Sequence, residues 1–263
     1  MNQIKMLVTD LDGTLLRKDK TISEKTIHTL IEFKNQGNEV VFATARPPRI
    51  VKEMIPQELK KEVSVICYNG ACAIDEKSNV VYEKDIEEQN VKKMIEIAEK
   101  YGYHNFSFEI NDELFSNFDT TYFFGNCPNE IISLEKMNFE TTNKMIICSQ
   151  TPITEECQKS LMPYGNAIIT DRGELCQIMN QEVNKWQAIL ALLSQKKLKP
   201  ENVIAFGDDY NDYDMIKNAG IGVAMQNGEE RIKEIANYVT GSNEQDGVAT
   251  FICEHLLGER ERE

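Results

Sequence analysis

Short apolar runs that alternate with longer amphipathic stretches restrict the possible folds of this chain most strongly. The runs have the length and composition of buried strands, and they lie at residues 4–9, 39–44, 64–68, 202–206 and 221–224. The stretches between them carry apolar residues at helical spacing. Strands that alternate with helices are typical of βαβ units, so the sequence predicts an α/β fold with a mostly parallel sheet.

The middle of the chain has a different pattern. There, apolar runs alternate with turn sequences such as Asn111-Asp112 and Asp171-Arg172-Gly173, which is typical of an antiparallel sheet with helices on one face. The parallel pattern returns afterwards. We therefore predict a Rossmann-like parallel-sheet core domain made of residues 1–82 and 183–263, with an inserted α+β domain at residues 83–182.

Two carboxylates, Asp10 and Asp12, directly follow the first predicted strand, and Gly13 marks a turn after them. Ligands of open α/β sheets bind at the carboxyl ends of the strands, so both acids are expected at that edge of the sheet. Such a pair suits a carboxylate nucleophile beside a carboxylic general acid/base, with Mg²⁺ neutralising the charge. The alternative is purely structural, a strand end followed by an Asp-Gly turn.

Three further polar groups are expected at the same edge of the sheet. The Thr44 hydroxyl and the N–H groups after it can bind phosphate oxygens, or Thr44 can simply be an N-cap before Pro47. Lys185 begins a helix, either as a cation of the site or as a surface lysine. Residues 207–212 place acids after a strand, as ligands or as a solvated loop. Together with the first pair, these groups supply the parts that phosphoryl transfer needs.

The composition limits the partners of the chain. The net charge of −14 argues against nucleic acid, which needs a basic surface, and it requires local cations around any phosphate substrate. The apolar runs are too short for a membrane span, and the N-terminus lacks the layout of a signal peptide. The seven cysteines are scattered and include no CxxC pair. We expect a cytoplasmic monomer or weak homodimer with reduced cysteines.

These motifs, in this order, resemble those of the haloacid dehalogenase-like superfamily of phosphohydrolases. The segment inserted between the Thr44 and Lys185 motifs is similar to the larger α/β (type IIB) cap of the Cof-type subfamily. The resemblance covers essentially the whole chain, including Tyr68-Asn69-Gly70 and residues 242–249. It implies a phosphatase that depends on Mg²⁺ and forms an aspartyl-phosphate intermediate.

The resemblance also implies a role for each motif residue. Asp10 would attack phosphorus, Asp12 would protonate the leaving alcohol and then deprotonate water, and Lys185 would hold phosphoryl oxygens. The other implied phosphate-binding or substrate-side residues are Thr44, Ala45, Arg46 and Asn211. The implied Mg²⁺ ligands are Asp10, the carbonyl of Asp12 and Asp208, with Asp212 in support beside the metal or Lys185.

Three positions depart from the family pattern. Ala45 stands where the family usually has the glycine of Thr-Gly-Arg, Trp186 replaces a common glycine after the motif lysine, and Gln226 replaces another frequent glycine. None of these changes removes a chemical group, so they affect the expected substrate range rather than catalysis.

The expected function is hydrolysis of small phosphorylated metabolites, such as sugar phosphates or similar phosphomonoesters. Two alternatives stay open from the sequence: a phosphotransferase with a non-water acceptor, and a non-catalytic regulatory protein that binds a phosphate ligand. The presence of Asp10, Asp12, Lys185 and Asp208 weighs against the non-catalytic alternative.

Overall fold

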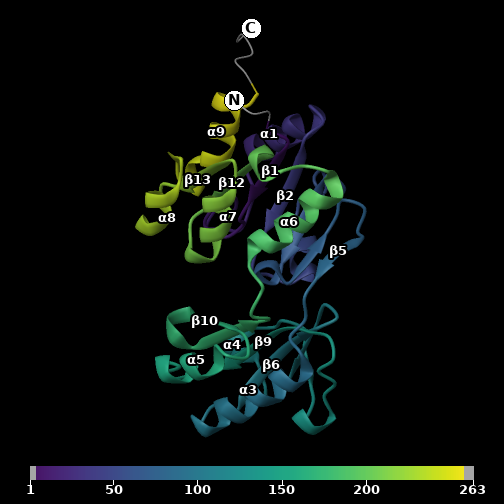
Figure 1. The fold of residues 1–263 in the computed structure, drawn as a ribbon, viewed down its shortest axis with the longest axis vertical. Helices are drawn as coiled ribbons and strands as arrows, with labels where there is room; N and C mark the ends of the chain where they lie inside the picture. The colour runs from purple at the N-terminus through teal and green to yellow at the C-terminus, as the bar shows by residue number, and fades with distance from the viewer. Residues whose placement is uncertain (1–3, 258–263) are drawn as a thin grey trace. The chain divides into compact units, whose positions relative to one another are not determined.

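The computed structural model describes residues 4–257. It divides into two compact units (Figure 1): unit 1 is Met1–Tyr82 with Asn184–Glu263, and unit 2 is Glu83–Val183. Each unit has its own sheet and its own apolar core. None of the helices within residues 4–257 has both the length and the apolar character needed to cross a membrane.

Unit 1 contains an eight-stranded sheet in the order β14-β13-β12-β1-β2-β3-β4-β5. Its strands are β1 Met6–Thr9, β2 Glu39–Ala43, β3 Val63–Cys67, β4 Cys72–Ile74, β5 Val80–Glu83, β12 Val203–Gly207, β13 Ile221–Met225 and β14 Tyr238–Thr240. All neighbours from β14 to β3 pair in parallel, and β4 is antiparallel to β3. β12, β1 and β2 are therefore adjacent, and their carboxyl ends lie together.

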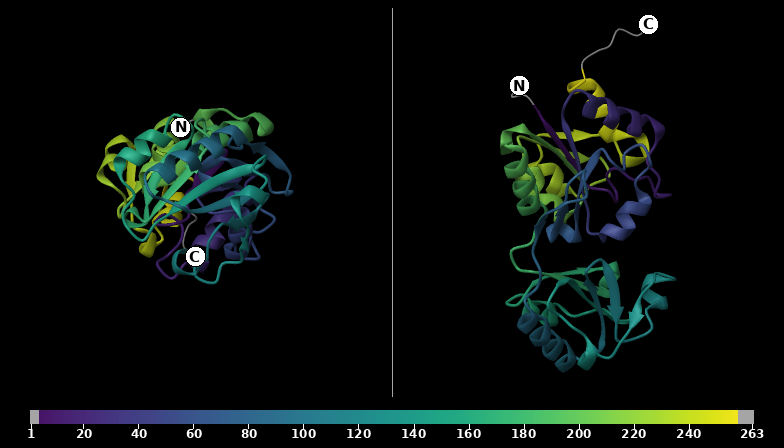
Figure 2. Two further views of the ribbon diagram at one scale, coloured as in Figure 1. Left: turned by 90° about the horizontal axis from the view of Figure 1, so that it is seen from below. Right: turned by 90° about the vertical axis from the view of Figure 1, so that its right-hand side faces the viewer.

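Helices cover both faces of this sheet. The helices of unit 1 are α1 Glu24–Asn35, α2 Pro48–Met54, α6 Lys185–Lys196, α7 Tyr213–Asn218, α8 Glu230–Ile235 and α9 Gly247–His255, with short 3-10 turns η1 Tyr68–Gly70, η4 Pro200–Asn202, η5 Tyr210–Asp212 and η6 Asn243–Gln245. α1 packs against α9, and α6 packs against α7. Figure 2 (right) shows the first pair, purple and yellow, across the sheet from the second pair, green. Strands covered on both faces explain the continuous apolar runs of the sequence.

Unit 2 contains a six-stranded sheet in the order β10-β11-β9-β6-β7-β8. Its strands are β6 Asn105–Ile110, β7 Glu113–Ser116, β8 Glu130–Ile131, β9 Thr142–Cys148, β10 Asn166–Thr170 and β11 Leu175–Met179, and its helices are α3 Glu88–Lys100, α4 Thr121–Phe124 and α5 Glu155–Leu161, with η2 Leu134–Lys136 and η3 Asp171–Gly173. The pairs are antiparallel except β7 with β8. α3 and α5 pack together beside the sheet, and alternate residues such as Phe106 and Phe108 enter the core with them.

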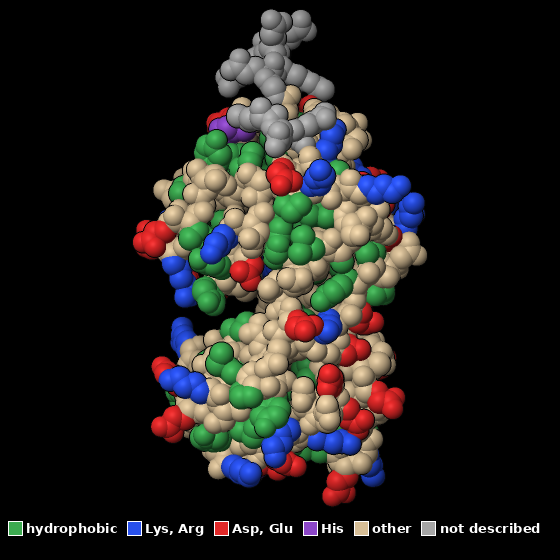
Figure 3. Space-filling view, in the orientation of Figure 1, with side chains coloured by type: hydrophobic (Ala, Val, Ile, Leu, Met, Phe, Trp, Pro, Cys, Tyr) green, Lys and Arg blue, Asp and Glu red, His purple; other side chains and the backbone are tan. Residues whose placement is uncertain are grey.

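The predicted fold class, a parallel-sheet α/β core with an α+β insertion, is confirmed. The sequence analysis did not identify β4, β5, β8 and β14, which have two to four residues each. Such short strands carry little periodic signal, and some of their apolar residues are exposed, as Val80 is. On the face drawn in Figure 3, acidic and basic side chains are mixed over both units.

Replacement of Asp85 by Asn is expected to stabilise the protein in a pH-dependent way. Asn143 Nδ2 donates to Asp85 Oδ1 at 2.7 Å and to Glu83 Oε1 at 3.1 Å. Burial, and then the charge of Glu83, raise the pKa of Asp85 to about 6. Because this pKa lies above that of the unfolded chain, the ionised carboxyl destabilises the fold increasingly as the pH rises from about 4 through 6.

Asp85→Asn keeps the acceptor for Asn143 and removes the charge. Since Asp85 is only half-buried, we expect a gain of about 1–2 kcal/mol near pH 8 and almost none near pH 4. Thermal unfolding of the intact protein at both pH values measures this, with Glu113→Gln as an exposed control in the same unit. A gain of equal size at both pH values would contradict the prediction.

Candidate active site

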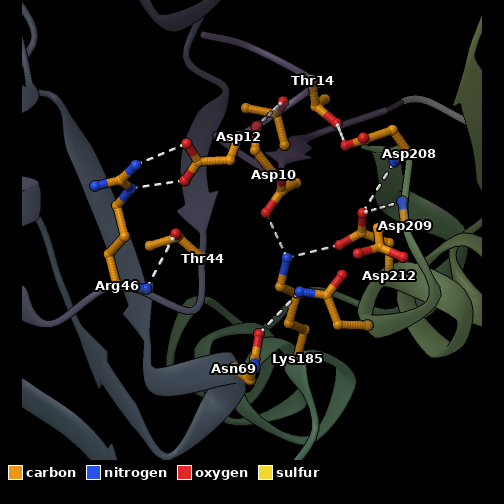
Figure 4. A network of polar contacts seen from close by, with 12 residues as sticks. Asp10, Asp12, Thr14, Thr44, Arg46, Asn69, Lys185, Asp208, Asp209 and Asp212 are labelled. Carbon is orange, nitrogen blue, oxygen red and sulfur yellow. Dashed lines mark hydrogen bonds and ion pairs between the residues drawn. The ribbon is translucent and has the colours of Figure 1, made fainter. Parts of the chain in front are cut away.

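The predicted site residues converge at the carboxyl edge of the unit 1 sheet (Figure 4). Asp10 follows β1, Thr44 follows β2, and residues 208–212 follow β12. Lys185 is the first residue of α6, which Asn184 caps by accepting from the N–H of Gln187 at 2.9 Å. The adjacency of β12, β1 and β2 brings these distant segments of the chain together.

A buried lysine links two buried carboxylates at the centre of the site. Lys185 Nζ donates to Asp10 Oδ1 at 2.5 Å and to Asp212 Oδ1 at 2.6 Å, and all three side chains are at most 7% exposed. Burial lowers the pKa of Lys185, but the two carboxylates outweigh it and raise that pKa overall. Burial raises the pKa of Asp10 well above its usual value despite Lys185, with Asp212 and Asp208 adding to the rise.

Asp208 completes a group of three carboxylates. One oxygen each from Asp10, Asp208 and Asp212 lies within 4.8 Å of the others. The carboxylate of Asp208 accepts from the Thr14 hydroxyl at 2.6 Å, and burial chiefly raises its pKa to about 6. The group contains three acids and one lysine, so the lysine cannot neutralise all of the negative charge. Carboxylate oxygens are also hard donors, which divalent cations prefer. These residues therefore fit a divalent cation such as Mg²⁺.

Asp212 differs from the other two acids because protein donors occupy both of its oxygens. Oδ1 accepts from Lys185, while Oδ2 accepts from the N–H groups of Asp208 and Asp209 at 2.9 and 3.2 Å. These contacts fix the loop that carries Asp208. Asp212 is thus better suited to support the loop and Lys185, and Asp10 and Asp208 are better suited to bind a metal.

Gly13 allows the first loop to approach Asp208 closely. Its φ is +84°, a value that side chains with a Cβ rarely adopt, and an added Cβ would lie 2.2 Å from Asp208 Oδ2. Only glycine satisfies both conditions. The Asp-Gly turn seen in the sequence is therefore needed to bring the loop against Asp208.

Asp12 forms an ion pair that the sequence analysis did not anticipate. Arg46 Nε and Nη2 donate to its two oxygens at 2.6 and 2.7 Å, and Lys20 Nζ donates at 2.7 Å. Burial raises the pKa of Asp12, but hydrogen bonds from Arg46 and Lys20 outweigh it and lower the pKa to about 2. In Figure 4 the Asp12 carboxylate points towards Arg46, whereas Asp10 points towards Lys185. Arg46, expected on the substrate side, is here the partner of Asp12.

Asn69 is a further site residue whose role the sequence analysis missed. Its side-chain Oδ1 accepts from Asn211 Nδ2 at 3.0 Å, and its backbone N–H donates to the Thr44 carbonyl at 2.9 Å. The next residue, Gly70, lies so close to the cap of α6 that a Cβ there would be 2.2 Å from the Asn184 carbonyl. η1 thus joins the Thr44, Lys185 and Asn211 segments. The sequence Tyr68-Asn69-Gly70 is part of the family resemblance, but no local pattern in it predicts the contacts of Asn69.

The remaining predicted phosphate-binding residues lie around this junction. Thr44 is buried, and its hydroxyl accepts from the N–H of Arg46 at 3.2 Å, with Ala45 between them. Asn211 donates to Asn69, and its Oδ1 is buried without a donor among residues 4–257. The buried Oδ1 of Asn211 is therefore an acceptor that a ligand can use.

A parallel α/β fold with three acids, a buried lysine and a threonine at the carboxyl edge of its sheet suits an enzyme that acts on phosphate groups. The family model for haloacid dehalogenase-like hydrolases matches residues 7–252. The chain therefore belongs to the family of haloacid dehalogenase-like hydrolases. The family resemblance that the sequence motifs indicate is confirmed over nearly the whole length of the chain.

Characterised relatives agree with this assignment. A 5-amino-6-(5-phospho-D-ribitylamino)uracil phosphatase of Bacillus subtilis is 30% identical, over 95% of this chain and 97% of the relative. A pyridoxal phosphate phosphatase of Escherichia coli is 26% identical, over 96% and 99%. A solved sugar phosphatase of subclass IIB is 24% identical, with a TM-score of 0.79 over 97% of this chain and all of that one, which shows the type IIB fold. The chain is therefore an enzyme, a phosphatase of the haloacid dehalogenase-like family.

Proposed function

We propose that this enzyme is a Mg²⁺-dependent phosphatase of small phosphorylated metabolites, such as sugar phosphates or similar phosphomonoesters, and that it works through an aspartyl-phosphate on Asp10. The observation that carries the proposal is the position of the Asp10 carboxylate, buried beside Lys185 and within 4.8 Å of Asp208 and Asp212. The names of the relatives support small phosphorylated substrates.

In the first half-reaction, an oxygen of Asp10 attacks phosphorus while the bond from phosphorus to the ester oxygen breaks. Lys185 and the Thr44 hydroxyl hold the phosphoryl oxygens, and the leaving oxygen takes a proton from Asp12. Mg²⁺, held by Asp10, Asp208 and the Asp12 carbonyl, would supply positive charge that favours the ionised carboxylates and neutralises the phosphate. The low dielectric around Asp10 strengthens each of these contacts.

In the second half-reaction, water attacks phosphorus of the aspartyl-phosphate while the bond from phosphorus to the Asp10 oxygen breaks, and Asp12 accepts the proton of that water. The contacts of Asp12 with Arg46 and Lys20 suit this half-reaction, because they keep the carboxyl ionised. Proton donation in the first half-reaction requires Asp12 to be protonated and to leave these contacts. Arg46 and Lys20 therefore favour the base form of Asp12 and oppose the acid form.

Unit 2 would serve as the cap domain that selects the substrate. The residues described at the carboxyl edge of unit 1 recognise the phosphate group and the metal, and none of them distinguishes one alcohol from another. Recognition of the alcohol must come from other side chains, and the likeness to a type IIB fold supports unit 2 as their source.

Phosphate release from an aryl phosphate tests the proposal. We expect turnover with Mg²⁺ and a fall of at least about 100-fold after chelation, since the excess negative charge of the three acids is then uncompensated. A panel of phosphorylated metabolites, ranked by kcat/KM, identifies the substrate class. Transfer of the phosphoryl group to added alcohol in place of water would support a phosphotransferase. Binding of phosphate without release of product would support a regulatory protein.

A further inference from the structure

The turn segment, residues 13–18, is held by side chains from the far end of the chain. Asn227 Nδ2 donates to the carbonyl of Gly13 at 2.7 Å. Asn243 Nδ2 donates to the carbonyl of Leu16 at 2.8 Å. The backbone of the turn segment is therefore bound at two points by residues more than two hundred positions later in the sequence.

Two acids extend these contacts. The N–H of Lys18 donates to Glu244 Oε1 at 2.7 Å. Arg17 Nη2 donates to both oxygens of Asp246, at 2.9 and 3.1 Å. We call Asn227, Asn243, Glu244 and Asp246 the clamp.

The ion pair of the clamp is not an ordinary surface pair. The side chain of Asp246 is 15% exposed and that of Arg17 is 36% exposed, and Arg17 Nε is buried without an acceptor among the described residues. The carboxylate of Asp246 thus accepts the side-chain hydrogen bonds of the partly buried Arg17 guanidinium. Removing Arg17 leaves the largely buried carboxylate of Asp246 without its cation, so this pair contributes more than a fully exposed one.

The clamp residues are also connected to one another. The N–H of Asn243 donates to Asn227 Oδ1 at 3.1 Å, and this joins the loop after β13 to η6. Asp246 has a φ of +55°, a left-handed conformation that aspartate adopts more readily than most residues.

The turn segment lies directly between the clamp and the catalytic acids. It begins next to Asp12, its Thr14 donates to Asp208, and its Gly13 packs against Asp208. A shift of the segment would move the Asp12 peptide and remove the partner of Asp208. We infer that the clamp residues Asn243 and Asp246, together with Arg17, are positioning residues. By fixing residues 13–18 they hold Asp12 and Asp208 at their places in the site.

Arg17→Met tests the inference, with Lys34→Met as its matched control. Lys34 pairs with Glu39 at 2.9 Å in the same unit, is partly buried, and does not belong to the clamp or the turn segment. Hydrogen exchange of residues 13–18 in the metal-free protein is the first readout. We expect Arg17→Met to speed this exchange at least about 10-fold and Lys34→Met to leave it unchanged.

The second readout is steady-state kinetics, and it rests on the proposed function. We expect Arg17→Met to lower kcat about 10-fold or more, with KM changed less than about 2-fold, because misplaced catalytic groups affect the reaction more than binding. Arg17→Lys should recover part of kcat. Asp246→Asn, which keeps the shape of the side chain, should reproduce both effects if Arg17→Met fails to fold.

Unchanged exchange in Arg17→Met and Asp246→Asn would overturn the inference, and so would faster exchange with an unaltered kcat. If the wild-type enzyme hydrolyses no phosphate ester, the proposed function fails, and the exchange measurement still decides whether the clamp holds the turn segment. The two failures are therefore distinguishable.

Discussion

Asp10→Asn is expected to abolish phosphate release while the protein stays folded. The amide has nearly the shape of the carboxylate, but it is not a nucleophile for phosphorus. It also removes one of the acids beside Asp208. Since the reaction is proposed to pass through this carboxylate, we expect kcat to fall at least about 10³-fold. The measurement is phosphate release from an aryl phosphate with Mg²⁺ near neutral pH.

Two controls make this result specific. Asp214→Asn, the same change in α7 of the same unit, should leave kcat nearly unchanged. Mass spectrometry of acid-quenched wild-type enzyme should show one added phosphoryl group that the Asp10→Asn variant lacks. Hydrolysis that survives Asp10→Asn would refute the covalent route.

Lys185→Met is expected to have the largest effect on stability. Methionine fills a similar volume, but Asp10 and Asp212 lose the cation that both contact. Breaking a buried ion pair in this way leaves uncompensated charge, and we expect a loss of about 3–5 kcal/mol in the free energy of unfolding. Activity should disappear as well, since Lys185 is proposed to hold phosphoryl oxygens.

The destabilisation by Lys185→Met has a definite pH dependence. Burial raises the pKa of Asp10 above the value in the unfolded chain, and Lys185 is the neighbouring charge that opposes this rise. Stability is then lost as the pH rises, because the folded state binds more protons than the unfolded one. Urea unfolding at about pH 5 and about pH 8 should therefore show the larger loss at the higher pH.

Lys196→Met is the matched control for this variant. Lys196 also pairs with two acids, Glu76 and Glu39, but its side chain is 18% exposed. Its removal should cost less, about 1 kcal/mol. A Lys185→Met variant that unfolds like the Lys196→Met variant at both pH values would contradict the expected role of burial.

The local patterns of the sequence determined the fold class and the convergence of the main site residues. Apolar runs with helices between them require a parallel sheet, and the carboxyl ends of parallel strands share one edge. For this reason Asp10, Thr44 and Asp208 were expected together, and the structure places them there. Lys185 was expected at a helix start, where the structure also has it. Their roles in catalysis stay proposals.

The tertiary structure alone decided which side chains pair across the loops. The contact of Arg46 with Asp12, that of Asn211 with Asn69, and the clamp on residues 13–18 join segments that no periodic pattern relates. A hydrogen bond depends on the distance and direction between two groups to within a fraction of an ångström, and loop conformation sets both. Sequence periodicity places a residue on a strand or helix, but the conformation of the packed loops determines its hydrogen-bond partner.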